Sequence, residues 1–371
     1  MHPLGTFIHK YARRIMAVLG LALLLGVVIF NGYVLADVGC RPLTEAELAT
    51  LAAQGDADAL ISPFSGIDTA ADAAIIEVSA AAFNQPLTQD EITRRYARPA
   101  VLLQANDPLQ VDLNIAAAGD YLLVFDMAVP PASPMPEGQI TLDGVFLDPA
   151  LRRVTFPIYY RNATVGFPKD RYGNDALMRQ IRNPRWTSYA IEDTNVRQAY
   201  PLRLSLTAGA HRLELRLTRG ALYLGTLYLV PFAPYPDYQQ YRDQHADALP
   251  VPDFSLSLEA ELPAFKNETS VRPVSSRSLD VTPYHTYCLL LNTLGGDSWI
   301  NSGSAVYYQI EVPQDGLYAI SLHALQDTRS NFTVYRRITI NGAVPFAELN
   351  AFPFHYAADW QDVHLGGAQP Y

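Results

Sequence analysis

The sequence predicts a mainly β protein built from two tandem β-sandwiches, and three observations lead to this fold class. Apolar and polar residues alternate along Val306–Val312, which is the period of a half-buried strand. Residues 338–340 run into Asn341-Gly342, a strong hairpin signal. A weaker copy of the same stretch occurs earlier in the chain, around residues 112–144.

The two copies are related by a nearly constant offset. Tyr121 and Tyr318 are 197 residues apart, and Gly144 and Gly342 are 198 apart. A constant offset along the stretch favours two copies of one β module. Chance similarity between two β-rich stretches is the alternative.

Composition limits the classes of protein to consider. A chain of 371 residues is expected to hold two or three domains, and a hydrophobic fraction of 49% is sufficient for sizeable cores. The net charge of -10 argues against nucleic acid as a partner. Two cysteines, Cys40 and Cys288, are too few for a disulfide framework and show no metal-ligand spacing.

Residues 1–36 have the pattern of a targeting segment. Basic residues up to Arg14 precede an uncharged run that ends at Val34-Leu35-Ala36, a pattern typical of a signal-peptide cleavage site. The run is long enough for a spanning helix, so the sequence predicts either a signal peptide cleaved after Ala36 or an N-terminal membrane anchor. In both cases the rest of the chain is extracellular, at the cell surface or secreted. Asp37-Val38-Gly39 is a poor context for lipid attachment at Cys40.

A stalk is predicted over residues 37–74. It contains one short helix from Thr44 to about Ala53, in which Thr44 and Glu47 form a capping box. Glycines, Pro63 and an alanine-rich stretch follow this helix.

The first module is predicted over residues 75–232. Strands are expected at 201–207, 211–218 and 222–230, with Leu213 and Leu215 facing the core. A polar insertion at 162–200 interrupts the module, and loops of this length are usually functional or disordered.

A proline-bracketed linker with a short helical segment is predicted over residues 233–252, and a second module over 253–371. The second module lacks counterparts of residues 202–230 before Tyr371. We therefore expect it to be incomplete, with an exposed edge and half a core, and Tyr371 to be the end of a fragment.

No motif for catalysis is present. The sequence contains no Gly-rich phosphate loop, nucleophile elbow, HExxH or CxxC. No carboxylate pair is selected by its spacing as a glycosidase dyad. The sequence therefore predicts a protein that is not an enzyme.

Glu259-Ala260-Glu261, the glycines before Trp299 and the strands that follow resemble carbohydrate-binding modules of the galactose-binding β-sandwich type. In that family such a glutamate pair helps to hold a structural Ca²⁺. Alternate residues of one strand point to the same side, as a calcium site requires. The resemblance implies Glu259 and Glu261 as metal ligands; a solvated acidic strand start is the alternative. The first module has Glu77 but Ser79 at these positions.

The whole arrangement resembles the N-terminal half of large extracellular solute-binding proteins from carbohydrate ABC importers of Gram-positive bacteria. The residues that carry this likeness are FPKDRYGN and NPRW in the insertion, the tyrosine-rich linker, NGAVPF and Phe352–Phe354. The resemblance implies a sugar ligand, an ABC transporter permease as partner and sugar uptake as the function. Two alternatives remain: the non-catalytic carbohydrate-binding region of a secreted polysaccharide-degrading enzyme, and a cell-surface spacer.

Glycan-binding proteins stack sugar rings on exposed aromatic side chains and read the hydroxyls with neighbouring polar groups. Each candidate chosen on this basis has a packed structural role as its alternative. The candidates are Trp299, Tyr284, Tyr287 and Asn292 in the second module, and Trp186, Arg185 and Asp170 in the insertion.

Overall fold

The computed structural model describes residues 75–193, 200–252, 254–328 and 330–366. In this part of the chain no helix is both long and apolar enough to span a membrane. The predicted signal or anchor segment and the stalk lie outside the described residues. The mainly β fold predicted from the sequence is confirmed: strands are many, and the α-helices are short.

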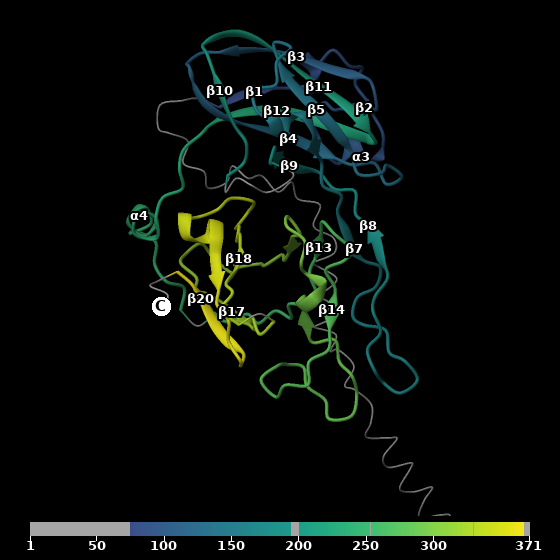
Figure 1. Cartoon of the computed structure of the whole chain (residues 1–371), viewed down its shortest axis with the longest axis vertical. Helices are drawn as coiled ribbons and strands as arrows, with labels where there is room; N and C mark the ends of the chain where they lie inside the picture. The colour runs from purple at the N-terminus through teal and green to yellow at the C-terminus, as the bar shows by residue number, and fades with distance from the viewer. Residues whose placement is uncertain (1–74, 194–199, 253, 329, 367–371) are drawn as a thin grey trace, which may run out of the picture.

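The first module, drawn in blue and teal in Figure 1, is a sandwich of two antiparallel sheets. In one sheet, β12 and β4 are the central strands, β1 and β2 pair with β12, and β9 and β10 pair with β4. The second sheet has the order β3-β11-β5-β6. The bounds are β1 Ile76–Val78, β2 Val101–Gln104, β3 Pro108–Ile115, β4 Gly119–Ala128, β5 Glu137–Leu142, β6 Val154–Thr155, β9 Thr187–Ala190, β10 Arg203–Leu206, β11 Gly209–Arg219 and β12 Ala221–Pro231.

The core lies between these two sheets. Leu213, Leu215 and Leu217 alternate along β11 and are at most 1% exposed, so the inward face predicted for this strand is confirmed. They meet Phe125 and Leu224 from the opposite sheet in one buried cluster. Burying an aliphatic side chain of this size stabilises the fold by about 2 kcal/mol, and the central strands therefore hold the module together. Short helical turns cross its rim: η1 Ala80–Ala82, α3 Glu91–Arg94 and η2 Pro149–Arg152.

The insertion of the first module is a hairpin that joins the two modules. Its strands β7 (Tyr160–Asn162) and β8 (Gln180–Arg182) leave the sandwich and pair with each other. Strand β7 also pairs with β13 (Phe265–Lys266) of the second module, in a sheet of order β16-β13-β7-β8. Figure 1 shows this hairpin running down beside the second module.

The second module contains short strands and no closed sandwich within residues 254–366. Its strands form two-stranded pairs, apart from β13 and β16 in the sheet shared with the insertion. The bounds are β14 Pro273–Val274, β15 Thr293–Leu294, η3 Gly296–Ser298, β16 Val306–Tyr307, β17 Ile320–Ala324, β18 Val334–Arg336, η4 Ala347–Ala351, β19 Phe352–Phe354 and β20 Gln361–Leu365.

The linker between the modules contains the predicted short helix. Helix α4 (Tyr238–Gln244) begins at a capping box in which Asp237 and Gln240 satisfy each other's backbone N–H groups. Tyr238 and Tyr241 pack on Phe346, with ring centroids 5.0 Å and 5.4 Å apart. The linker therefore contributes to a small core of the second module.

Three pairings of the first module recur in the second. Glu137 pairs with Thr155 between β5 and β6, and Tyr335 pairs with Pro353 between β18 and β19, each partner 198 residues further on. The Asp143-Gly144 and Asn341-Gly342 turns have similar positive φ angles and are closed by equivalent bridges, Leu142 with Val145 and Ile340 with Ala343. The predicted repeat is therefore present in three dimensions.

A third pairing extends the repeat beyond the sequence signal. Met127 of β4 pairs with Thr187 of β9, and its counterpart Ala324 of β17 pairs with Gln361 of β20. A tryptophan precedes each of these partner strands, Trp186 and Trp360 respectively. In addition, the Tyr121 hydroxyl donates to the carbonyl of Ala117 at 2.7 Å, and the Tyr318 hydroxyl donates to the carbonyl of Gln314 at 2.6 Å.

One expected strand of the second module is largely absent. The alternation at Val306–Val312 predicts a strand over all seven residues, but only Val306–Tyr307 are in a strand. In the first module the equivalent strand β3 pairs along its length with β11. Residues 308–312 lack such a partner in the described part of the chain, so the alternating pattern does not produce a ladder there.

Candidate functional site

Two loops from different modules are bonded together at the tip of the insertion hairpin. The backbone N–H of Asp175 donates to the carbonyl of Leu289 at 2.8 Å, and the N–H of Leu289 donates to the side-chain oxygen of Asn174 at 2.8 Å. The N–H of Leu291 donates to Oδ2 of Asp175 at 2.9 Å. We call residues 170–175 and 284–291 the tyrosine loops.

The tyrosine loops present three exposed aromatic rings. Tyr172 is 62% exposed, Tyr284 42% and Tyr287 74%. The guanidinium of Arg171 lies 4.6 Å from the ring centre of Tyr172, and His285 contacts the ring of Tyr287 edge to face. This surface therefore combines flat apolar faces with hydrogen-bonding groups.

Asp170 shapes the first of these loops. Its carboxylate accepts from the N–H groups of Tyr172 and Asn174 at 2.8 Å and 2.9 Å, and from the Asn174 side-chain amide at 3.0 Å. The amide of Asn174 is the main cause of a lowered pKa at Asp170, against a weaker opposing effect of desolvation. Asp170, which the sequence predicted to be a ligand contact, thus holds Tyr172 in place.

Asp175 and Lys169 stabilise the hairpin tip from within, because both residues belong to the insertion. Their side chains form an ion pair at 2.5 Å in which the aspartate is 5% exposed and the lysine 38%. The tip is therefore a fixed support for the exposed rings.

Trp186 is buried and unavailable as a sugar platform. Its indole is 5% exposed, stacks on Tyr96 with centroids 4.1 Å apart, and donates from Nε1 to the carbonyl of Ile92 at 2.8 Å. It covers the outer face of the β4–β12 sheet together with α3 and Tyr223. The structure therefore gives this candidate the packed structural role.

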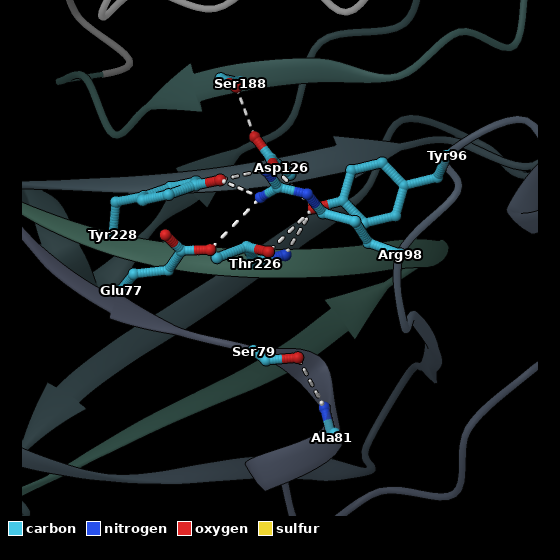
Figure 2. A network of polar contacts seen from close by, with 9 residues as sticks. All are labelled: Glu77, Ser79, Ala81, Tyr96, Arg98, Asp126, Ser188, Thr226 and Tyr228. Atoms are coloured by element: carbon cyan, nitrogen blue, oxygen red, sulfur yellow. Dashed lines mark hydrogen bonds and ion pairs between the residues drawn. The ribbon is translucent and has the colours of Figure 1, made fainter.

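The buried polar network in Figure 2 holds Tyr96, the ring on which Trp186 stacks. Asp126 is fully buried and accepts from the hydroxyls of Tyr96 at 2.5 Å, Tyr228 at 3.1 Å and Ser188. The Tyr96 hydroxyl is also bonded to the backbone and side chain of Thr226. Burial, followed by the bond to Asp126, raises the pKa of Tyr96 well above its ordinary value. These groups satisfy one another, which is the pattern of a structural network.

Arg98 and Glu77 lie at the rim of this network. Nη1 of Arg98 is 3.3 Å from Oε1 of Glu77 and donates to the Tyr228 hydroxyl at 3.1 Å. Glu77, the counterpart in the first module of a predicted metal ligand, is thus in an ion pair.

Arg185 has a structural contact between the modules. Its guanidinium lies 3.8 Å from the ring centre of Phe265, and that ring stacks on Tyr307 at 4.3 Å. Arg185 is 8% exposed. Arg185 is therefore packed against the second module, which lies far along the chain, whereas Lys169, Arg171 and Arg179 of the same insertion are exposed.

Trp299 and Asn292 also have structural contacts. Arg336 lies over the Trp299 ring at 4.7 Å, and the indole Nε1 donates to the carbonyl of Ser304 at 3.1 Å. Asn292 is 4% exposed and is bonded to both backbone groups of Ser276 and to the carbonyl of Pro283. Among the seven residues that the sequence predicted to contact a ligand, Tyr284 and Tyr287 are the aromatic residues whose side chains are exposed.

The predicted calcium ligands do not lie on a strand. Glu259 is exposed and Glu261 is 3% exposed, on either side of a turn at Ala260. Burial raises the pKa of Glu261 to about 8, and the charges of Glu259 and Asp175 add to the rise. No group of three or more His, Cys, Asp or Glu residues in the described ranges could hold a metal ion. This arrangement does not fit the strand-borne calcium site that the sequence predicted.

A separate hollow lies beside α3 in the first module. It is open to solvent, has a volume of about 280 Å³ and is lined by Asp90, Ile92, Arg95, Pro131 and Pro184, together with Glu91. Asp90 is occupied by the helix cap and by the Tyr223 hydroxyl, and Glu91 pairs with Arg95 at 3.0 Å. Its polar groups are therefore largely engaged with one another.

Comparisons with known proteins give similarity of fold only. No family model and no curated protein matches the sequence. Among solved structures, a β-(1,4)-mannanase with a family 35 carbohydrate-binding module from Podospora anserina is 15% identical over 44% of this chain and 28% of its own, with a TM-score of 0.27. A family 35 carbohydrate-binding module from Clostridium thermocellum is 12% identical over 43% of this chain and all of its own, with a TM-score of 0.24.

A family 6 carbohydrate-binding module from a laminarinase of Zobellia galactanivorans is 9% identical over 42% of this chain and 99% of its own, with a TM-score of 0.24. This chain spans a little over a quarter of the mannanase. At these identities and TM-scores the likenesses carry no argument about function.

Sequence reasoning missed Tyr172. The signal was present in Asp170-Arg171-Tyr172-Gly173-Asn174, where an aromatic residue lies in a short loop closed by an aspartate and a glycine. That the loop is bonded to residues more than a hundred positions away could not be read from the sequence.

Proposed function

We propose that this protein is a non-catalytic carbohydrate-binding protein and that the tyrosine loops contact the sugar. The observation that carries the proposal is the exposure of Tyr172, Tyr284 and Tyr287 on two loops that hydrogen bonds fix to each other. Single exposed rings are common, but several on bonded loops are typical of a binding surface, and sugar rings present apolar C–H faces that stack on aromatic rings.

The polar groups around these rings suit sugar hydroxyls. Arg171 and His285 lie against the tyrosine rings, so their N–H donors can reach hydroxyls at the ring edges. Nδ1 of His285 already accepts from the backbone N–H groups of Tyr287 and Cys288, which leaves Nε2 as the donor. The surface is open, and a stack of this kind supports weak binding that several sites on one polysaccharide would strengthen.

A rigid support favours binding, because a preformed site loses little conformational entropy when the ligand arrives. The bonds of Asp170 and the ion pair between Lys169 and Asp175 supply that support. We therefore assign these two aspartates to positioning the tyrosines.

Affinity electrophoresis of the full chain through gels containing different polysaccharides tests the proposal. Retardation in at least one gel is expected for the wild type and is expected to be lost in Tyr287→Ala. Tyr335→Ala is the matched control, because Tyr335 is 60% exposed but lies on β18, away from the tyrosine loops. Retardation that is equal in both variants, or absent from every gel, would refute the assignment.

The biological role of the protein depends on the domains or partner proteins to which the proposed sugar-binding surface is linked. We propose the general role of glycan attachment, as in the non-catalytic region of a polysaccharide-degrading enzyme. The importer role and its permease partner rest on sequence resemblance alone. Copurification of the chain with a permease from membranes would support the importer role, and its failure in cells that take up the bound sugar would oppose it. The cell-surface location is a prediction that surface proteolysis of intact cells would check.

A further inference from the structure

The second module exposes side chains whose counterparts in the first module are buried. Tyr308, Ile310 and Val312 are 36%, 48% and 49% exposed. Their counterparts, 197 residues earlier, are at most 2% exposed, and these are Val111, Leu113 and Ile115. Ile340 is 42% exposed, whereas its counterpart Leu142 is 6% exposed.

In the first module, strands β11 and β12 cover this face. Strand β11 pairs with β3 and with β5, and so fills the gap between them. Strand β12 pairs with β4 and supplies Leu224, Leu227 and Leu229 to the core. These two strands follow β10 directly and form a hairpin at Gly220.

The second module has counterparts of the strands β3, β4 and β5, which pair with this hairpin in the first module. Residues 305–312 correspond to β3, residues 335–340 to β5, and β17 to β4. Strand β17 pairs with β20 on one edge, as β4 pairs with β9. Near its start, Leu317 bridges to Pro250 of the linker. In the described residues the other edge of Ile320–Ala324 carries no strand.

We propose that this face of the second module is the docking site for a β-hairpin with the chemistry of β11–β12. The occupant has two antiparallel strands in which leucine-like residues alternate with polar ones, and it completes the sandwich by strand addition. The internal repeat specifies this occupant, because it shows what covers the same face in the first module. This inference does not depend on the proposed sugar binding.

The geometry also specifies how the hairpin would pair. One strand would lie antiparallel to residues 305–312, as Leu213 pairs with Val111 in the first module. The other would lie antiparallel to β17, as Leu227 pairs with Phe125. Adding such strands satisfies exposed backbone groups and buries Tyr308, Ile310 and Val312 at the same time.

A peptide that copies residues 209–231 is the probe for this site. Labelled peptide is titrated with the full chain, and binding is followed by fluorescence anisotropy. A control peptide carries L213S, L215S and L217S, which keep the polar face and remove the inward one. The copied peptide is expected to bind, and the control about tenfold more weakly or not at all.

Two protein variants locate the binding. Ile310→Lys places a charge on the exposed face and is expected to weaken peptide binding about tenfold. Leu87→Lys is the matched control, because Leu87 is 55% exposed in the first module, and it is expected to leave binding unchanged. Circular dichroism spectra that match the wild type confirm that both variants are folded.

Either of two results would overturn the proposal. One is equal binding of the copied and control peptides, or of Ile310→Lys and wild type. The other is a dimer of the full chain that dissociates in Ile310→Lys, which would mean that a second copy covers the face. Sedimentation of the wild type and of Ile310→Lys shows whether such a dimer forms.

Discussion

The two modules carry the same alternating strands, but among the residues that the structure describes only the first module has a closed core. Leu113 of the first module is 2% exposed, and its counterpart Ile310 of the second is 48% exposed. The pattern of apolar residues is alike in both, so the difference comes from β11 and β12, which pair with β3, β4 and β5 in the first module. Alternation thus indicates which side of a strand is apolar, and the presence of partner strands decides whether that side is buried.

The largest contrast is expected at the paired tryptophans. Trp186→Ala removes a 5% exposed indole and leaves the carbonyl of Ile92 without its donor, so it is expected to lower the unfolding free energy by about 3–5 kcal/mol. Trp360 is half-buried and stacks on His323 at 5.2 Å, and Trp360→Ala is expected to cost about 1 kcal/mol. Urea unfolding of the full chain measures both, and equal losses would contradict the contrast.

The core positions sharpen the comparison further. Leu113→Ala opens a cavity between two sheets and is expected to cost about 2–5 kcal/mol. Ile310→Ala removes a side chain that is 48% exposed and is expected to cost less than about 0.5 kcal/mol. The denaturation midpoints of the two variants measure this difference. An Ile310→Ala variant as destabilised as Leu113→Ala would contradict it.

The second module is expected to lose stability as pH rises. The folded chain keeps the proton of Glu261 up to a pKa of about 8, whereas the unfolded chain loses it near the ordinary pKa of 4.5. Between these values the folded state binds more protons, so the unfolding free energy falls with rising pH, by at most about 1.4 kcal/mol per pH unit.

Glu261→Gln is the control for this pH dependence. It is expected to flatten the dependence of the urea midpoint between pH 5 and pH 7.5, and an unchanged slope in the variant would show that other groups cause it. The same titration tests the calcium prediction from the sequence. Added Ca²⁺ would raise the stability of the wild type at pH 7.5, but not that of the variant, if Glu261 were a ligand.

The smallest effect is expected where the modules are alike. Gly144 and Gly342 have φ angles of +78° and +87° in equivalent turns, and alanine is strained in this region. Gly144→Ala and Gly342→Ala are each expected to cost about 1 kcal/mol. Thermal melting checks this, and a cost confined to Gly144 would indicate that the second turn contributes little to its module.

Local signals were sufficient to predict most of the first sandwich. The alternation at 211–218 predicted β11, because this strand has a buried and a polar side. The strand predicted at 222–230 is β12, which is buried on both sides along most of its length. The Asn341-Gly342 turn was predicted because few residues adopt positive φ readily. The capping residues around Asp237 were typical of a helix start.

Long-range contacts could not be predicted in this way. Strand β7 pairs with β13 across about a hundred residues, so nothing in Asn162–Tyr200 alone indicated that Arg185 lies over Phe265. For the same reason Trp186 and Asn292 were predicted to contact ligand and are instead buried. Tyr284 and Tyr287 met the expectation of exposure because their loop extends outward.

Hydrogen exchange of backbone amides in the full chain tests the central claim most directly. The two modules are repeats that differ in the strands that cover one face. Amides of residues 111–115 are therefore expected to exchange slowly, at the rate set by opening of the sandwich, while those of their counterparts 308–312 exchange at nearly the rate of unstructured peptide. Equal protection of the two segments would contradict the account.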